Sequence, residues 1–404
     1  MDANDHNAIS CMDANDHNAT NCMDANDHNA IKHSKMPLVM TILIVVALLS
    51  VLFSLALGRF VVAPQDVVGI LLTNICNFFS SAFNNAFGGA GGAVGAVGAG
   101  GALGALGSTS SQAASDHASW TAQSENIVMN VRLPRVLCAF LIGCALSLSG
   151  AVYQGVFRNP LVSPDLLGVS SGACVGASIA ILAHLGGILV QICAFAFGIA
   201  AVVLAVLISR LFKQRSALTL VLAGIIVSGL ASSILSLCQY LANIYDELPQ
   251  IIFWTLGSLA TVNNSDLVGL LPIVVIVSIV LLLLRWRLNL LTLSDAEAQS
   301  MGTNVKRLRG ITIVCSTALT ASAVCVSGTI GWVGLIIPHI SRLLVGTNNS
   351  HLLPASCLLG GAFLVIIDTL ARNLTASEIP LSILTGITCT IIFVAVIARR
   401  RILA

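Results

Sequence analysis

The chain has 404 residues, of which 56% are hydrophobic and only 9% are Asp, Glu, Lys or Arg. Soluble domains average about 25% charged residues, so this composition excludes an ordinary soluble protein and indicates an integral membrane protein. The net charge of +2 argues against a nucleic-acid-binding protein. The 12 cysteines lie mostly singly in apolar runs, and no two have the spacing Cys-x-x-Cys, so we interpret them as core residues.

The first 35 residues are dominated by a tandem repeat. The sequence MDANDHNA begins at Met1, Met12 and Met23, a period of 11 residues. A period of 11 can support a right-handed helical coil, but these repeats carry no apolar stripe, and Asn and Asp favour turns over helix interiors. We therefore predict that residues 1–35 form a disordered tail. Because Met36 directly precedes the first apolar run, both Met1 and Met36 are candidate start positions.

Uncharged apolar stretches define the spans of a transmembrane domain at residues 36–404, since about 20 apolar residues cross the hydrocarbon layer as a helix. Two stretches are too long for one crossing, and we expect them to break at His184–Gly187 and around Gly328–Gly331. The predicted fold class is therefore an all-α polytopic membrane protein with about ten transmembrane helices. The stretches are residues 36–58, 136–157, 166–209, 216–245, 267–284, 310–341, 343–367 and 379–398.

Basic residues give the orientation, because Lys and Arg accumulate on the cytoplasmic side of a membrane. With ten crossings and the N-terminus inside, 15 of the 19 basic residues fall on the cytoplasmic side, and only Arg59, Arg132, Arg135 and Arg372 lie outside. One crossing more or fewer would move the basic residues that follow it to the opposite side of the membrane and remove this asymmetry. We therefore predict that both termini are cytoplasmic.

A low-complexity segment follows the first span. Between Gly89 and Gly107 the chain repeats Gly-Ala-x six times, so that every third residue is glycine. The segment lacks proline, which argues against a collagen helix, and it contains too much glycine for a stable α-helix. We interpret residues 76–119 as an extracytoplasmic insertion without catalytic content. The alternative is a glycine-rich hairpin inside the membrane.

The span at 216–245 carries four polar residues on one helical face, because they are spaced by four, four and three positions. Such a face can line a translocation pathway, which is our prediction. The alternative is packing against a neighbouring helix, since Ser is common at helix contacts in membranes. The four residues are Ser228, Ser232, Ser236 and Gln239.

The most informative cytoplasmic loop spans residues 288–309. Ser294 is placed to cap a short helix with an acidic first turn, and Gly302 is placed to end it before a basic segment. Such a helix-turn-helix offers a rigid contact to a cytoplasmic partner, whereas the alternative is a simple amphipathic surface loop. The residues of this predicted contact are Ser294, Asp295, Glu297, Gly302, Lys306 and Arg307.

Motifs of catalysis are missing from the sequence. It contains neither a GxxxxGK[ST] phosphate loop nor an HExxH zinc motif, and we predict no catalytic residue, no metal site and no cofactor bound by this chain. The deep parts of the spans hold almost no acidic residue or histidine, which argues against coupling to a proton or sodium gradient. The energy for any transport must then come from elsewhere.

Several long motifs resemble the permease subunits of the iron-siderophore, haem and cobalamin importers, the type II ABC importer family. The most extensive is RLPRVLCAFLIGCALSLSGAVYQGVFRNPLVSPDLLGVSSGACVGA, at residues 132–177. The loop at 288–309 also matches, and so do GTIGWVGLIIPHISR (Gly328–Arg342), DTLAR (Asp368–Arg372) and EIPLSILTG (Glu378–Gly386). The N-terminal repeats and the Gly-Ala insertion do not belong to the family pattern.

The resemblance implies a type II ABC importer permease fold in a prokaryotic cytoplasmic membrane. Such a subunit is not an enzyme, and its expected cargo is an iron-siderophore, with haem or cobalamin as alternatives. The implied partners are a second copy of the permease, two cytoplasmic ABC ATPase subunits that use ATP and Mg²⁺ and dock on residues 288–309, and an extracytoplasmic substrate-binding protein. Nucleic acid is not among the expected partners.

Three of the outer arginines, Arg132, Arg135 and Arg372, stand beside spans on the side that is otherwise poor in positive charge. Arginine forms bidentate pairs with carboxylates, so, given the resemblance, we interpret these residues as docking points for acidic residues of the binding protein. Anchoring of the spans at the membrane surface is the alternative. A rival hypothesis from another class is an ion-coupled secondary transporter that works without nucleotide.

Overall fold

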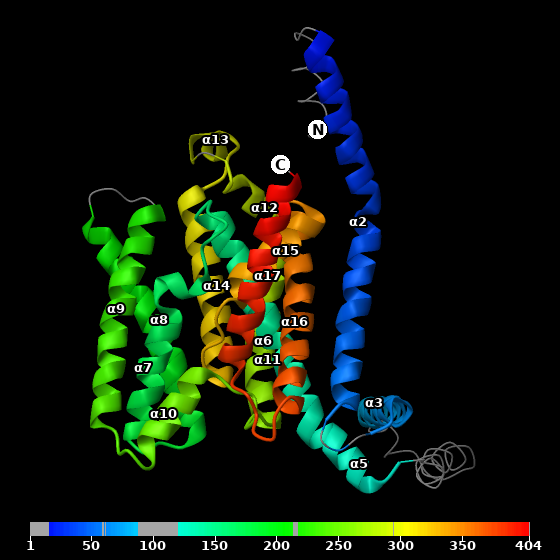
Figure 1. Cartoon of the computed structure of the whole chain (residues 1–404), viewed down its shortest axis with the longest axis vertical. Coiled ribbons are helices and arrows are strands. Elements are labelled where there is room, and N and C mark those ends of the chain that lie inside the picture. The colour runs from blue at the N-terminus through cyan, green and yellow to red at the C-terminus, as the bar shows by residue number, and fades with distance from the viewer. Residues whose placement is uncertain are drawn as a thin grey trace.

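The computed structural model describes residues 16–58, 60, 62–87, 120–212, 217–293 and 295–403. Within these ranges the chain forms a bundle of helices, most of which run along one common direction, and no strand occurs among the described residues (Figure 1). In chain order the elements are α2 (Asp16–Ala56), α3 (Pro64–Phe87), α5 (Ala122–Asn126), the π-helix η2 (Ile127–Arg132), α6 (Leu133–Val156), the 3₁₀ helix η3 (Pro164–Leu167), α7 (Val169–Leu182), α8 (Gly187–Leu211), α9 (Ala217–Leu241), α10 (Glu247–Leu256), α11 (Asn264–Leu283), α12 (Arg285–Leu290), α13 (Asp295–Ser300), α14 (Val305–Ser327), α15 (Val333–Val345), α16 (Asn349–Asn373) and α17 (Leu381–Leu403).

Eight helical stretches in the described part are long and apolar enough to cross a membrane, and α7 and α15 are shorter apolar helices. Together they give the ten helices that the sequence predicts. Both predicted breaks are confirmed: α7 ends at Leu182 and α8 begins at Gly187, while α14 ends at Ser327 and α15 begins at Val333. The all-α polytopic fold is therefore correct.

Helix α2 is longer than the span predicted for it. It begins at Asp16, so residues 16–35 are helical in the structure, although their repeat sequence predicts a disordered tail. A helix that is already nucleated in an apolar span extends at low cost, because propagation does not repeat the penalty of nucleation. Residues 1–15 lie outside the described residues.

The predicted insertion at 76–119 also begins differently. Helix α3 continues to Phe87, so residues 76–87 are helical and belong to an element that starts at Pro64. Proline suits this first helical position, because its missing N–H would be unpaired there in any case. Residues 88–119, which contain the Gly-Ala repeats, lie outside the described residues.

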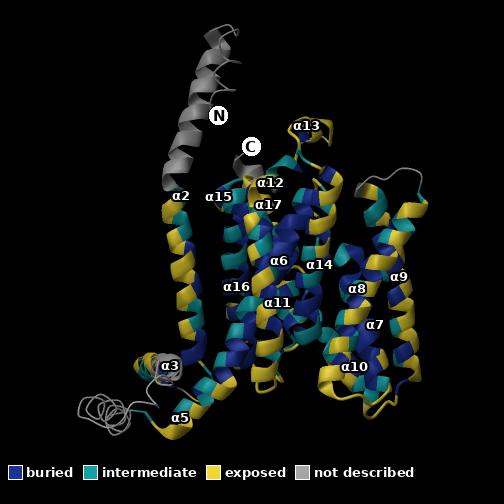
Figure 2. Cartoon of the chain, turned by 180° about the vertical axis from the view of Figure 1, so that it is seen from behind, coloured by how far each residue is buried: buried dark blue, intermediate teal, exposed yellow. Residues whose placement is uncertain are grey.

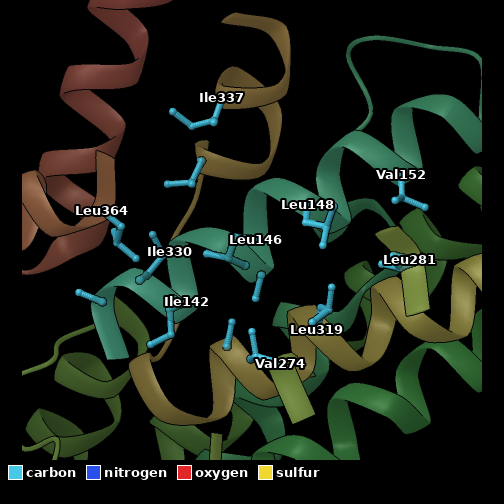
Figure 3. Close-up of a cluster of buried hydrophobic side chains, with 14 of the residues drawn as sticks. Ile142, Leu146, Leu148, Val152, Val274, Leu281, Leu319, Ile330, Ile337 and Leu364 are labelled. Carbon is cyan, nitrogen blue, oxygen red and sulfur yellow. The ribbon is translucent and has the colours of Figure 1, made fainter. Parts of the chain in front are cut away.

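Helix α6 forms the centre of the bundle. Most of its residues are buried (Figure 2), and it contacts α11, α14, α15 and α16. A continuous apolar cluster joins these helices, and Figure 3 shows part of it. The labelled members are Ile142, Leu146, Leu148 and Val152 from α6, Val274 and Leu281 from α11, Leu319 from α14, Ile337 from α15, Leu364 from α16, and Ile330 from the α14–α15 connection.

Two glycines of α6 let neighbouring backbones approach closely. A Cβ atom on Gly143 would lie 2.2 Å from the carbonyl oxygen of Gly360 in α16, and one on Gly150 would lie 1.8 Å from that of Gly334 in α15. Backbone atoms at these distances cannot move aside cheaply. Close glycine contacts of this kind are how helices pack in membranes, where burial from water does not drive association.

Candidate functional site

The start of α6 and the end of α16 carry a buried ion network. The Arg135 guanidinium donates to Asp368 through Nε (3.0 Å to Oδ1) and Nη2 (2.9 Å to Oδ1). It also donates to Glu378 through Nη1 (2.9 Å to Oε1) and Nη2 (2.8 Å to Oε2). The side chain of Asp368 is fully buried, whereas that of Glu378 is 32% exposed. One arginine thus binds two carboxylates from segments that are far from it in the sequence.

Arg372 completes the network from the next turn of α16. Its Nε lies 3.1 Å from Asp368 Oδ2, and its Nη2 donates to Ser54 Oγ in α2 at 2.7 Å. The hydroxyl of Thr369 lies 2.7 Å from the same Ser54 oxygen. Asp368 is therefore shared by two arginines, and the network ties α2, α6 and α16 together.

Arg132 has a different set of partners. Its Nη1 donates to the carbonyl oxygens of Leu55 (2.7 Å) and Ala56 (3.1 Å), and its Nη2 donates to that of Phe60. The last carbonyls of a helix have no partner within the helix, and a cation is favourable at this end. Arg132 thus caps the C-terminus of α2. A Cβ on Gly58 would lie 2.5 Å from Arg132 Nη2, so this position fits only glycine unless the guanidinium shifts.

The structure therefore brings together the three arginines predicted to dock a partner, and it gives each one a role inside the chain. They line a pocket of about 210 Å³ with Glu378. Sequence reasoning missed their internal partners. The i, i+4 spacing of Asp368 and Arg372 was an available signal for one ion pair, but the partners of Arg135 come from a distant segment. Docking of another protein at this pocket stays a prediction.

The opposite end of the bundle presents α13 on the connection between α12 and α14 (Figure 1). Asp295 Oδ1 accepts hydrogen bonds from Arg158 Nη2 at 2.7 Å and Arg309 Nη2 at 3.1 Å. Partial burial acts to raise the pKa of Asp295, but hydrogen bonds and charge from Arg309 and Arg158 outweigh it and hold the pKa below its usual value. Two ion pairs thus fix α13 to the C-terminal end of α6 and to the N-terminal part of α14.

The end of α13 confirms the turn predicted at Gly302. Gly302 has φ +74°, its N–H donates to Gln299 O at 2.9 Å, and the N–H of Thr303 donates to Ala298 O at 3.2 Å. This pair of bonds is the Schellman motif, in which a left-handed residue closes a helix. Asn304 then caps α14 by accepting from Arg307 N at 3.1 Å. Glu297, Lys306 and Arg307 are exposed, and Ser294 lies outside the described residues.

The polar face predicted on α9 is only partly packed. Ser232 and Ser236 are exposed, whereas Ser228 and Gln239 are half-buried. The buried positions of α9 contact α7 and α8 instead, through a different face. Ser236 Oγ donates to Ser232 O within the helix at 3.0 Å. Helix packing within one chain therefore accounts for Ser228, which lies beside Gly168, but not for Ser232 and Ser236.

A cavity that the sequence did not reveal lies near the ends of α7, α8 and α10. It measures about 810 Å³ and has Trp254 and Phe253 in its wall. His184 Nε2 lies 3.3 Å from Glu247 Oε1 at its rim, and Asp246 also lines it. Among the described residues that line this cavity, none is Lys or Arg. Its charge pattern is therefore opposite to that of the arginine pocket.

Comparison with protein families gives one clear match: residues 93–399 match the FecCD transport family. The chain is 46% identical over 265 residues to the molybdate import system permease protein MolB of Haemophilus influenzae, covering 65% of this chain and 78% of that protein. It is 42% identical over 275 residues to an iron chelatin transport system permease protein of Helicobacter pylori, covering 68% of this chain and 83% of that protein.

A solved structure is also similar over most of its length. It is described as an inward-facing conformation of a metal-chelate type ABC transporter, and it shares 34% sequence identity with this chain at a TM-score of 0.73. The similarity covers 90% of this chain and 99% of that one. The arrangement of helices seen here is therefore shared with a protein of that type.

Proposed function

The chain belongs to the FecCD transport family, and on this premise we propose that it is the membrane permease subunit of an ATP-driven importer for an iron-siderophore. The observation that carries this proposal is the match over 90% of the chain to a metal-chelate type ABC transporter. Such a subunit opens a path for cargo and makes no covalent bond. Because the sequence has no phosphate-binding loop, a separate pair of ATPase subunits supplies the energy.

The geometry of α13 supports its role as the contact for those ATPases. Asp295 fixes the helix to the bundle through Arg158 and Arg309, and the Gly302 turn fixes its far end. A push on a rigid element is transmitted to the helices that hold it, here α6 and α14. Exposed Glu297, Lys306 and Arg307 offer charged groups to the partner.

The unpacked face of α9 supports a second copy of the chain as partner. Ser232 and Ser236 are exposed beside large exposed apolar residues such as Leu230 and Leu237. A polar stripe within an apolar helix surface is costly when it faces lipid but not when it faces a water-filled path. Two copies that meet near α9 would enclose such a path, with the serines along it.

The pocket formed by Arg132, Arg135 and Arg372 supports the docking of a substrate-binding protein at the opposite end. It holds three arginines against the two carboxylates Asp368 and Glu378, so an excess of one positive charge remains there. An acidic side chain of the binding protein complements that excess. In this arrangement both chain termini lie in the cytoplasm of a prokaryotic cell, on the side of α13.

A second candidate cargo is molybdate, which the 46% identity to MolB favours. The cavity near α10 argues for the chelate instead. It carries Asp246 and Glu247, and no Lys or Arg is found among its described lining residues. A wall of this charge repels a small dianion more strongly than a neutral or cationic chelate.

The cargo can be assigned with a deletion strain that lacks this gene. We expect the strain to lose uptake of ⁵⁵Fe supplied as a ferric hydroxamate siderophore, and to regain it when the gene is restored on a plasmid. Its molybdenum content in molybdate-limited medium should equal that of the parent strain. A fall in molybdenum content with unchanged siderophore uptake would replace the chelate by molybdate as the cargo.

A further inference from the structure

Helix α3 is the part of the described structure that the proposed transport function leaves unexplained. Its axis lies across the direction of the spans: Figure 1 shows α3 end-on beside the lower end of α2, whose length runs up the picture. Only the residues between Ala56 and Pro64 separate the two helices. Since α2 is a membrane span, α3 lies at the level where that span leaves the membrane.

Several contacts anchor α3 to the protein. Val67 and Ile70 are buried, and a Cβ on Gly69 would lie 2.4 Å from the ring of Trp120. Asn74 Nδ2 donates to Glu125 Oε1 in α5 at 3.1 Å. These contacts fix the rotation of the helix about its own axis, so they determine which residues face outward.

The outward arc of α3 is apolar. Val68, Leu72 and Ile75 are 42%, 57% and 51% exposed, and Cys76 is also exposed. Their spacing of four and three residues places Val68, Leu72 and Ile75 along one side of the helix. A helix surrounded by water would carry polar residues on this arc, whereas an amphipathic helix on a membrane carries apolar ones.

The arc is continuous with a surface that faces lipid. An apolar groove of about 970 Å³ runs between α2, α3 and α16, and Val67 and Val68 of α3 line one end of it. Leu49 and Phe53 of α2 line it too and are 58% and 63% exposed. Because the exposed side of a membrane span contacts acyl chains, the same chains reach the adjoining arc of α3.

We propose that α3 is an interfacial helix that lies in the extracytoplasmic surface of the membrane, with the Val68, Leu72, Ile75 and Cys76 face in the acyl-chain region. Its partner is the phospholipid bilayer itself. Asp66 is the one charged residue of α3, so the helix binds through apolar burial and not through attraction to anionic lipid headgroups. The proposal does not depend on the cargo or on the energy source of the transporter.

Neighbouring positions on α3 provide a matched test. Cys76 and Asn77 are both exposed but lie about 100° apart around the helix. In one variant, the spin label is attached to native Cys76; in the other, it is attached to Asn77→Cys in a Cys76→Ser background. Both carry Ser at Cys11 and Cys22 and at the free cysteines that are only partly buried, Cys193, Cys315, Cys325 and Cys357. Both full-length proteins are reconstituted in phosphatidylcholine vesicles. Collision rates with oxygen, which concentrates in lipid, and with a water-soluble nickel chelate are then compared.

We expect oxygen to dominate at position 76 and the nickel chelate to dominate at position 77. Adding an anionic phospholipid should leave both ratios unchanged. In a Val68→Asp, Leu72→Asp variant labelled at Cys76, the nickel chelate should gain access, because charged residues lift this face from the lipid. Equal nickel access at positions 76 and 77 in the parent protein would overturn the proposal, and so would oxygen dominance at both.

Discussion

Replacing Asp368 by alanine is expected to deplete the membrane of folded protein. The change leaves the guanidinium groups of Arg135 and Arg372 buried without the carboxylate that they share. Removing one partner of a buried ion pair costs about 3–5 kcal/mol, which is a large part of the roughly 5–15 kcal/mol that stabilises a typical domain. The measurement is the thermal unfolding midpoint of the protein purified in detergent, together with its yield from the membrane.

Glu378→Gln is the matched control, because Glu378 binds the same arginine but is 32% exposed. Solvent screens its ion pair, so the expected loss is much smaller. If Asp368→Ala unfolded at the same midpoint as the parent protein, the network would not be structural, and the arginines would be free to serve docking alone.

This structural role changes how variants of Arg132, Arg135 and Arg372, the three arginines predicted to dock a partner, are interpreted. Reversing the charge of Arg135 would place an acid against Asp368 and Glu378, and reversing that of Arg132 would remove the cap of α2. Loss of uptake in such variants follows from misfolding as readily as from failed docking. Docking must therefore be measured as the affinity of the binding protein for permease that is shown to be folded.

Replacing Gly302 by proline is expected to abolish ATP-driven uptake while the ATPase subunits of the assembled complex continue to hydrolyse ATP. Gly302 has φ +74°, whereas proline is fixed near −65°. Proline also lacks the N–H that donates to Gln299 O. The turn that closes α13 cannot form, so a movement of the ATPase is no longer passed to α14. Uptake and phosphate release are measured on the same reconstituted complex.

Gly302→Asn is the control for this position, because asparagine tolerates the left-handed conformation better than other residues with a side chain. A Cβ at Gly302 meets no atom within 4 Å, so the asparagine variant should keep most of its uptake. Tight coupling of hydrolysis to transport in the proline variant would show that the rigidity of α13 is not required.

The spans could be predicted from the sequence because their signal is local. A segment that crosses the membrane must be a continuous helix, because lipid offers no hydrogen bonds to exposed backbone groups. Such helices appear in the sequence as long uncharged runs, and Gly187 and Gly328 mark the breaks between them. Gly302 was predictable for the same reason, since a left-handed helix end has a strong preference for glycine. In each case the residues that decide the structure lie within a few positions of one another.

What the sequence did not reveal depends on contacts between distant segments. Asp368 and Glu378 meet Arg135 only because α6 and α16 pack together. The cavity beside Glu247 is assembled from the ends of several helices. The amphipathic character of α3 was hidden because residues 67–115, which include most of α3 and the Gly-Ala repeats, form a single charge-free stretch in the sequence.

The most direct test of the account is transport by purified components in liposomes. We predict that the chain, reconstituted with the ATPase subunits and the binding protein proposed as its partners, takes up a labelled iron-siderophore only when ATP is supplied on the side of α13. The chain alone should show no flux under a proton or sodium gradient. Gradient-driven uptake by the chain alone would contradict the account and establish an ion-coupled carrier.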